Sequence, residues 1–259
     1  MNAEALQSAP EAAGAWSGRN FDEAAASQME RFIADFGQMY RERNEALKEV
    51  TRAHHHALLQ LALAAELKDD DTGMHIVRIG FLAEALALKL GQPQAFARML
   101  RRAAPMHDVG KIGTPDRVLK KAGALSADER IEMNRHPAMG AEILGRSRIP
   151  LFQLAAEVAL THHERFDGTG YPHGLAGHDI PLSGRITAVV DFYDALTMDR
   201  CYRPAFCTAT ALDMLMTERG RSFDPEVVDV FVAHAEALEA LKQSINVTAP
   251  GFQALIDAD

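Results

Sequence analysis

The spacing of apolar residues constrains the fold of this chain more than any other feature of its sequence. Alanine and leucine dominate, apolar residues recur at helical intervals, and no stretch alternates apolar and polar residues as a half-exposed strand would. The chain has 259 residues, 47% of them hydrophobic and 24% charged, which suffices for one sizeable core with at most a small appendage. We therefore expect an all-α fold.

The first 60 residues predict a disordered lead followed by one long helix. Residues 1–20 are rich in Ala, Gly and Ser and show no periodicity, as is typical of disordered segments. Residues 21–60 carry a heptad-like pattern whose seam is interrupted by Arg43. The seam runs through Met29, Ile33, Phe36, Tyr40, Leu47, Val50, His54, Ala57 and Leu61.

This long helix has two interpretations. It is either a dimerising or signal-transmitting stalk, or an amphipathic helix that packs on its own domain. Three consecutive histidines, His54, His55 and His56, fall within it. Because neighbouring helical positions point in different directions, we expect these histidines to pack or to lie at the surface rather than to bind one metal.

Charge and cysteine content exclude several classes of protein. The formal net charge of -9 argues against a partner such as polymeric nucleic acid, although bound cations can reverse the charge inside a site for a small anion. No apolar run approaches the ~18 residues of a membrane span, and the N-terminus lacks a signal-peptide layout, so we expect a cytoplasmic protein without membrane contact. The two cysteines, Cys201 and Cys207, are expected to be free thiols.

Histidine and carboxylate residues recur in positions that suit metal ligands. Asp71 and His75 are four residues apart and would share one face of a helix, although an acidic cluster before a helix also provides an N-cap. The adjacent pair His107 and Asp108 supplies an imidazole and a carboxylate that can bridge two cations, with Lys111 three residues later. The other interpretation of this pair is an exposed helix end with a capping aspartate.

Three further segments extend the pattern. His136 precedes Pro137 and begins a helical segment. His162 and His163 close an apolar helix and diverge by about 100° around it, so they would serve two metals, or one metal and a substrate. Asp191 lies in an apolar run, where a carboxylate is costly to bury unless it is paired or metal-bound. Each residue alone is explained as a satisfied core polar group, but the whole set predicts a metal site.

Three strings of the sequence stand out: His107-Asp108-Val109-Gly110-Lys111, the segment from His162 to Pro172, and the segment from Asp191 to Arg203. Together they closely resemble the HD-GYP family, a branch of the HD-domain metal phosphohydrolases. The resemblance covers about Leu61 to Ala233. It implies an HD-domain helical bundle with a Gly-Tyr-Pro loop in a catalytic domain at 61–259, a metal cluster at the bundle centre, and hydrolysis of cyclic di-GMP to pGpG, to GMP, or to both.

The resemblance also assigns roles in catalysis and metal binding. Asp108 would bridge two metals, Lys111 would contact the scissile phosphate, and Asp194 would act either behind a metal ligand or on the attacking water. Asp71 matches a position that is Glu in some members that hold a third metal, and its side chain is one methylene shorter. The other metal ligands would be His75, His107, Asp108, His136, His162, His163 and Asp191.

Substrate and partner contacts are implied in the same way. Arg200 and Arg203 would hold the substrate phosphates. Tyr171 would contact the substrate or dock a partner such as a GGDEF-type cyclase, on a loop where Gly168 and Gly170 provide backbone conformations closed to other residues. Apart from the resemblance, the heptad-like pattern makes the N-terminal helix the candidate surface for a homodimer.

Several choices remain open at the level of sequence. Two or three divalent metal ions are implied; the resemblance suggests Fe or Mn, while the mixed ligands also suit Ni or Zn. Cyclic GMP-AMP is an alternative substrate, because it differs from cyclic di-GMP at one base. A nucleotide phosphohydrolase of the wider HD superfamily would share the His-Asp pair without the Gly-Tyr-Pro loop. A non-catalytic sensor or docking module would be favoured by missing ligands, and none of the implied ligands is missing.

Overall fold

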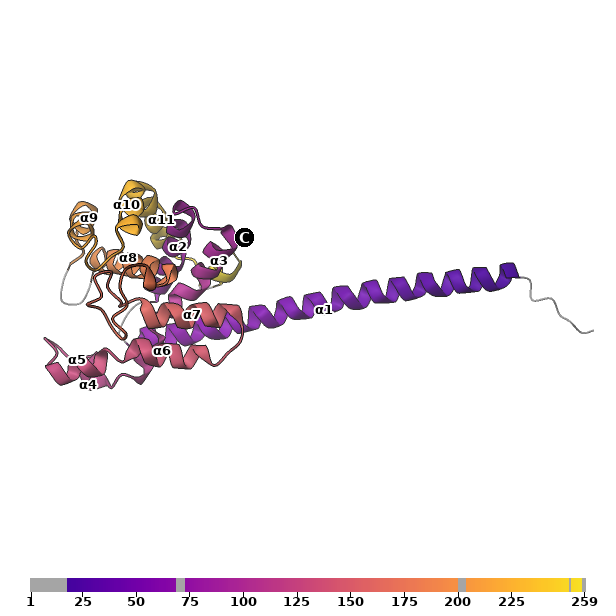
Figure 1. Ribbon diagram of the computed structural model, residues 1–259, viewed down its shortest axis with the longest axis horizontal. Helices are drawn as coiled ribbons and strands as arrows, with labels where there is room; N and C mark the ends of the chain where they lie inside the picture. Colours follow the sequence, from indigo (N-terminus) through magenta and orange to yellow (C-terminus); the bar gives the residue numbers. More distant parts are fainter. Residues whose placement is uncertain (1–17, 69–72, 200–203, 252, 258–259) are drawn as a thin grey trace, which may run out of the picture. The chain divides into compact units, whose positions relative to one another are not determined.

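The computed structural model describes residues 18–68, 73–199, 204–251 and 253–257 (Figure 1). Within these ranges every regular element is a helix, and strand-like pairing is limited to two isolated β-bridges. The predicted all-α class is therefore confirmed. Among the described helices, none combines the length with the apolar character that a membrane crossing requires.

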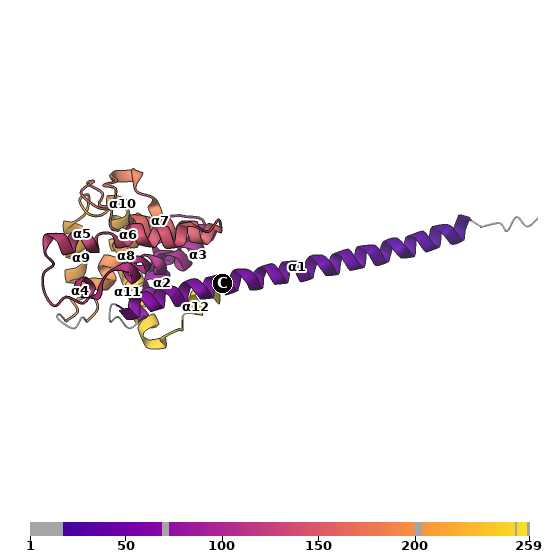
Figure 2. The same ribbon diagram turned by 90° about the horizontal axis from the view of Figure 1, so that it is seen from below.

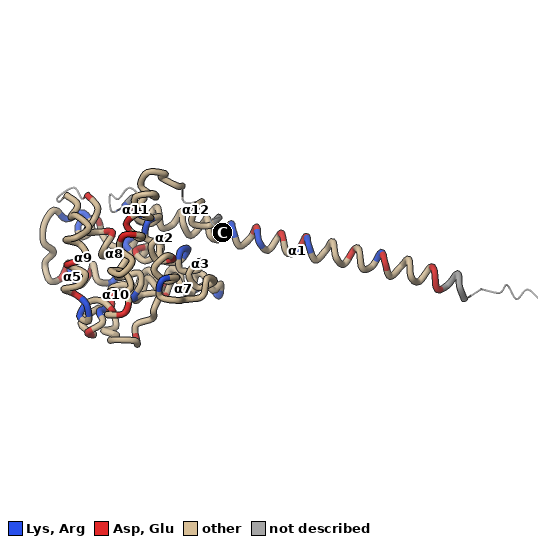
Figure 3. The backbone as a smooth tube through the Cα atoms, turned by 90° about the horizontal axis from the view of Figure 1, so that it is seen from above, with Lys and Arg blue, Asp and Glu red and all other residues tan. Residues whose placement is uncertain are grey.

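The chain divides into two units, Met1–Thr51 and Arg52–Asp259. In the first unit the described residues belong to helix α1, which spans Gly18–Lys68, so the predicted long N-terminal helix is confirmed. Large apolar side chains of this unit are exposed. Charged residues of both signs are spread along it (Figure 3). Residues 1–17, which make up most of the predicted disordered lead, lie outside the described residues.

The second unit includes the last turns of α1, which pack into its core. Leu58, Leu59 and Ala62 are buried in one apolar cluster together with Ile76 and Val77 of the next helix. The alternation of buried and exposed positions in these turns is that of an amphipathic helix whose apolar face is covered. From Arg52 onward, α1 is therefore part of the folded domain.

The three consecutive histidines of α1 pack or lie at the surface, as the sequence predicts. His55 is buried, and burial together with the charge of Arg102 lowers its pKa to about 4. His54 is exposed, and its ring lies edge-on to that of Phe152 with 6.3 Å between the ring centroids.

The remaining helices form a bundle around α2 (Met74–Lys89). Ile79 and Leu82 of α2 belong to one buried apolar cluster, and its Ile76 and Val77 belong to the other, so this helix joins the two halves of the core. The other elements are α3 (Gln94–Ala103), η1 (Ala104–Met106), η2 (Val109–Gly113), α4 (Asp116–Leu119), α5 (Ala127–Met133), α6 (His136–Gly145), α7 (Pro150–Thr161), η3 (Gly177–Asp179), α8 (Leu182–Leu196), α9 (Thr208–Thr217), α10 (Pro225–Ala233), α11 (Ala235–Thr248) and α12 (Ala254–Asp257).

Close backbone approaches bring distant segments of this bundle together. A Cβ on Gly110 of η2 would lie 1.9 Å from the carbonyl oxygen of His136, so only glycine fits against the start of α6. A Cβ on Gly184, in the first turn of α8, would lie 2.2 Å from the hydroxyl oxygen of Thr161 at the end of α7. Helices α6 and α7 lie side by side (Figure 1 and Figure 2). As a result, η2, the start of α6 and the end of α7 meet at one place.

Candidate metal centre

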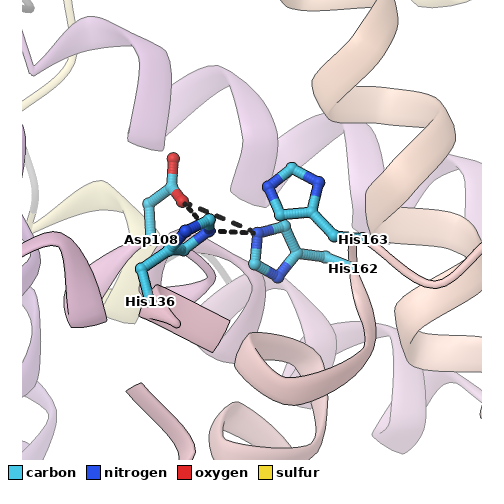
Figure 4. A group of neighbouring side chains, drawn as sticks. All are labelled: Asp108, His136, His162 and His163. Carbon is cyan, nitrogen blue, oxygen red and sulfur yellow. Dashed lines mark hydrogen bonds and ion pairs between the residues drawn. The ribbon is translucent and has the colours of Figure 1, made fainter. Parts of the chain in front are cut away.

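Seven side chains of metal-ligand type gather in two adjacent groups of the second unit. The Asp108 group consists of Asp108, His136, His162 and His163. The His75 group consists of His75, His107 and Asp191. Within each group the potential ligand atoms lie within 4.8 Å of one another. Figure 4 shows the imidazoles of His136 and His162 directed toward the carboxylate of Asp108.

These seven side chains come from five separate segments. His75 lies in the first turn of α2, and Asp191 lies in α8. The pair His107 and Asp108 connects η1 to η2. His136 is the first residue of α6, while His162 and His163 directly follow α7.

Asp108 faces both groups. Its Oδ1 atom is 3.1 Å from Nε2 of His136 and 3.6 Å from Nε2 of His162. Its Oδ2 atom is 3.4 Å from Nε2 of His107 and 2.7 Å from Nζ of Lys111. One carboxylate oxygen is therefore directed to each group, which is the arrangement that a carboxylate shared by two cations requires.

Main-chain carbonyls fix the orientation of three of the histidines. In His107, His136 and His162 the Nδ1 atom lies 2.8–2.9 Å from the carbonyl oxygen of the residue three positions earlier. Because a carbonyl oxygen only accepts, Nδ1 carries the proton and donates it, and Nε2 keeps its lone pair. All three Nε2 atoms face the cluster, so these imidazoles are held in the tautomer that binds a metal.

His75 is oriented by a buried carboxylate instead. Its Nδ1 is 2.7 Å from Oδ2 of Asp194, while its Nε2 is 3.4 Å from Oδ1 of Asp191. Arg78 donates from Nε to Oδ1 of Asp194 at 2.7 Å and from Nη2 to Oδ2 at 3.0 Å. Asp194 is fully buried, and both of its oxygens are engaged. This geometry supports a role behind His75 for Asp194, rather than a role on the attacking water.

Arg78 was not anticipated from the sequence. The sequence feature that could have identified it is its charge, which lies one helical turn after His75 in a helix that is otherwise largely apolar. Such a charge is costly to bury unless it is paired, so a carboxylate partner was implied. The partner, Asp194, lies 116 residues away, and local sequence patterns do not reveal it.

The carboxylates of the centre are held in the ionised form. Burial alone would raise the pKa of Asp108, but the charges of Lys111 and His107 hold it well below its usual range. Burial likewise opposes ionisation of Asp191, and the hydrogen bond to His75 together with the charge of His107 brings its pKa far below the ordinary value. Both groups are therefore in the charge state that binds a cation.

The histidines differ in their affinity for protons. Burial lowers the pKa of His162. Burial, together with the charges of His162 and His136, lowers the pKa of His163 well below the ordinary value. For His75 burial is outweighed by the hydrogen bonds to Asp191 and Asp194, which raise its pKa well above the ordinary value. A cation entering the His75 group would thus compete with a proton.

Two buried atoms of the centre fit a bound cation directly. Nε2 of His107 and Oδ1 of Asp108 are buried and make no hydrogen bond. Buried polar atoms in native proteins are nearly always satisfied, so each such atom requires an explanation. A divalent cation between the imidazoles and carboxylates would satisfy both, and the N and O donor set is that of Fe, Mn, Ni and Zn sites.

The loop that carries Tyr171 is anchored beside the Asp108 group. The buried carboxylate of Glu164, another residue that the sequence did not single out, accepts the backbone N–H groups of His173 at 2.8 Å and Leu175 at 3.0 Å. The ring of Tyr171 stacks on that of His163 with 4.8 Å between centroids and an angle of 29°. Burial raises the pKa of Tyr171 to about 12, so its hydroxyl stays protonated and can donate a hydrogen bond.

The two glycines of this loop have different roles. Gly168 has φ of 78°, a conformation that favours glycine. Gly170 does not have positive φ; a Cβ there would lie 2.2 Å from the backbone nitrogen of Arg165. The expectation of a special backbone conformation therefore holds for Gly168, whereas at Gly170 glycine is required by the close approach of two chain segments.

Three of the predicted site residues, Asp71, Arg200 and Arg203, lie outside the described residues. The structure therefore places neither the predicted ligand of a third metal nor the predicted phosphate-binding arginines. Glu66, at the end of α1, was not singled out from the sequence. It is a buried carboxylate whose pKa is raised by burial, and the charges of His75 and Asp108 act on it.

A cavity of about 580 Å³ adjoins the centre. His163, Tyr171 and Asp191 line it on the side of the metal centre. Its volume is in the range of small-molecule sites. A ligand in this cavity would touch the side chains proposed to hold metals.

Comparison with known proteins relates the chain to one family. Residues 33–227 match the model of the HD domain family. The chain is 42% identical over 185 residues to the 3'3'-cGAMP-specific phosphodiesterase 2 of Vibrio cholerae, a match that covers 71% of this chain and 35% of the relative. It is also 42% identical over 196 residues to the cyclic di-GMP phosphodiesterase response regulator RpfG of Xanthomonas campestris, covering 76% of this chain and 52% of that protein.

One solved structure supports the fold. The cyclic GMP-AMP specific phosphodiesterase V-cGAP3 of V. cholerae superposes with a TM-score of 0.57 at 18% identity, covering 78% of this chain and 53% of that chain. The chain spans about half the length, or less, of the curated relatives it matches. The shared part includes all seven side chains of the two groups, because residues 75–191 fall within the matched family model.

Proposed function

The chain belongs to the HD domain family, and we propose that its second unit hydrolyses cyclic di-GMP at the centre formed by the Asp108 group and the His75 group. The observation that carries this proposal is the position of Asp108, which directs one carboxylate oxygen to each group. Relatives that are 42% identical and named cyclic dinucleotide phosphodiesterases support the substrate class.

The residues present fit two divalent cations. The Asp108 group would hold one, the His75 group would hold the other, and Asp108 would be shared. Two such ions would supply a hydroxide near neutral pH and neutralise charge on the phosphate. We favour iron or manganese for the mixed imidazole and carboxylate ligands, with nickel or zinc also suited. A third ion would depend on Asp71.

Side chains of the protein then position the groups that react. Lys111, with Nζ 2.7 Å from Oδ2 of Asp108, places a positive charge where negative charge develops on the phosphoryl oxygens. Asp194 and Arg78 hold His75 with its Nε2 toward the centre. Water oxygen forms the new bond to phosphorus, the bond from phosphorus to the ribose 3'-oxygen breaks, and that oxygen takes a proton. The product is linear pGpG, and a second hydrolysis would give GMP.

Metal analysis paired with product analysis tests this proposal. The protein is purified anaerobically, its metals are counted by mass spectrometry, and products from cyclic di-GMP and from cyclic GMP-AMP are separated by chromatography. We expect two or three metals per chain and release of pGpG or GMP. The Asp108→Asn variant should lose most of its metal and nearly all activity, whereas Asp179→Asn, an exposed control, should keep both. Full metal content and turnover in Asp108→Asn would contradict the assignment.

Cyclic GMP-AMP is the second candidate substrate. It is favoured by the relative named for that dinucleotide, which is as similar to this chain as the cyclic di-GMP phosphodiesterase is. Faster cleavage of cyclic GMP-AMP than of cyclic di-GMP in the same assay would identify cyclic GMP-AMP as the preferred substrate. Bound metal with no cleavage of either dinucleotide would instead favour a sensor or docking module.

We further propose that the first unit forms a homodimer. Met29, Phe36 and Val50 are seven or fourteen residues apart, Phe32 and Met39 fall between them at coiled-coil spacing, and all five are at least half exposed. Arg43 occupies the same seam, where a charged residue specifies register at a cost in stability. The Tyr171 loop would be the contact for a GGDEF-type cyclase. The cytoplasmic location expected from the sequence also stays a prediction.

A further inference from the structure

The cavity beside the metal centre has polar lining residues that the proposed chemistry does not use. Besides His163 and Asp191, it is lined by Glu218 and Ser222, which lie in the turn after α9, and by Arg165. Apolar surface of the same cavity comes from Met214, Phe192 and Phe223. A ligand in the cavity would therefore meet the proposed metal ligands, apolar walls and the carboxylate of Glu218.

The backbone of this turn holds Glu218 in place. Its N–H donates to the carbonyl oxygens of Met214 and Leu215, each at 3.2 Å. Its own carbonyl oxygen accepts the N–H groups of residues 221–223 at 3.0–3.2 Å. Gly220, with φ of 76°, provides the positive φ that closes the turn. The position of the carboxylate is therefore set before any ligand arrives.

The Glu218 carboxylate has one oxygen left for a ligand. Oε2 accepts hydrogen bonds from the Ser222 hydroxyl and from Nη2 of Arg165, the latter at 3.3 Å. Among the described residues no hydrogen bond reaches Oε1, which forms an ion pair with Nη1 of Arg221 at 3.8 Å. The hydrogen bond from Ser222 lowers the pKa of Glu218, so at neutral pH the group is ionised and only accepts.

We propose that this cavity binds a guanine base of the cyclic dinucleotide, with Glu218 accepting the N–H donors at guanine N1 and N2. The inference rests on the proposed function, because the base is expected there only if a guanine dinucleotide is cleaved at the adjoining centre. Guanine offers two neighbouring donors on this edge, which match an ionised carboxylate. Adenine offers a lone pair at N1, which would face the same oxygen and be repelled. The aromatic and thioether walls suit the faces of a purine.

One consequence concerns mixed substrates. In cyclic GMP-AMP only one base is guanine, so only one orientation places guanine against Glu218. The two phosphodiester bonds are then not equivalent at the metal centre. The enzyme should open cyclic GMP-AMP mainly at one of its two bonds and give one linear product, and it should cleave cyclic di-AMP poorly.

The Glu218→Gln variant of the full, manganese-loaded chain tests the base pocket. Glutamine keeps the size of the side chain, and its amide can pair with either purine. Wild type should favour cyclic di-GMP over cyclic di-AMP by about ten-fold or more in kcat/KM, and Glu218→Gln should narrow this ratio by about ten-fold. The mixture of linear products from cyclic GMP-AMP should become more even. Asp213→Asn, an exposed substitution on α9, is the matched control and should leave the ratio unchanged.

Two further measurements separate failure of the pocket from failure of the proposed function. Hydrolysis of bis(p-nitrophenyl) phosphate, which carries no base, should be equal in wild type and Glu218→Gln. Calorimetric titration with GMP and with AMP reports on the pocket without any hydrolysis, and wild type should bind GMP about ten-fold more tightly, a preference lost in Glu218→Gln. Equal binding of GMP and AMP by wild type, or an unchanged preference in Glu218→Gln, would overturn the inference even if cyclic di-GMP is cleaved.

Discussion

Single residues behind the proposed metal ligands determine how firmly the side chains of those ligands are held in one orientation. Asp194 is buried, bonds His75 through Nδ1, and is itself held by two donors from Arg78. Carboxylates that orient a ligating imidazole in this way contribute to metal affinity without touching the metal. Breaking such a buried pair also destabilises a fold, by about 3–5 kcal/mol when one partner is removed.

Replacement of Asp194 by Asn should therefore weaken metal binding and also lower the free energy of unfolding. We expect a loss of about 10–100-fold in metal affinity, measured by competition with a chelator, with a helical circular dichroism spectrum like that of wild type. A double variant, Asp194→Asn with Arg78→Met, should lose little further affinity, because Arg78 acts through Asp194. If the losses of the two single variants simply add, Arg78 has a separate role.

The seven side chains of the two groups could be singled out from the sequence, most of them because they lie within contiguous strings; their role as metal ligands stays a prediction. His107 and Asp108 are adjacent, as are His162 and His163, and each pair has a characteristic context. Arg78 and Glu218 are single polar residues in helices or turns, and their importance depends on partners or cavities formed only on folding. The sequence marks Arg78 only as a charge in a largely apolar helix, without naming its partner, and no local pattern distinguishes Glu218 from an ordinary surface charge.

At the scale of elements, the long helices were predictable and the short ones were not. The apolar spacing that defines α2, α7 and α8 is strong over ten or more residues. The short 3-10 segments η1 and η2 flank His107 and Asp108, and η2 packs against the start of α6 through Gly110. This is a contact between two backbone segments, and its only trace in the sequence is a single glycine.

The last turns of α1 predict a pH dependence of stability. His55 has a pKa of about 4 in the folded protein against an ordinary value of 6.5, because burial and then Arg102 disfavour its charged form. Between pH 6.5 and 4, His55 is protonated in the unfolded chain but stays neutral in the folded chain. The free energy of unfolding therefore falls as pH decreases toward 4. In the metal-free protein, denaturant titrations should show a shallower fall over this window for His55→Leu than for wild type. Equal slopes would mean that this histidine is solvated in the folded state.

At the scale of the whole molecule, the exposed apolar stripe of the first unit predicts self-association. Phe36 lies in the middle of the stripe and is 55% exposed. Phe36→Glu would place a negative charge in the seam of each helix of a dimer and should convert the protein to a monomer in sedimentation experiments. Arg43→Leu should have the opposite effect and strengthen the dimer. Identical sedimentation of all three proteins as monomers would contradict the proposed dimer.

The carbonyl contacts of His107, His136 and His162 have a consequence for how such a centre varies among proteins. Each imidazole is oriented by a main-chain carbonyl three residues earlier in its own segment. The ligand and the group that orients it therefore move together when that segment shifts. A core substitution that shifts a whole segment would move a ligand without misdirecting it. Gradual repacking is therefore expected to change the radius of the ion that the centre accepts before it costs the centre a ligand.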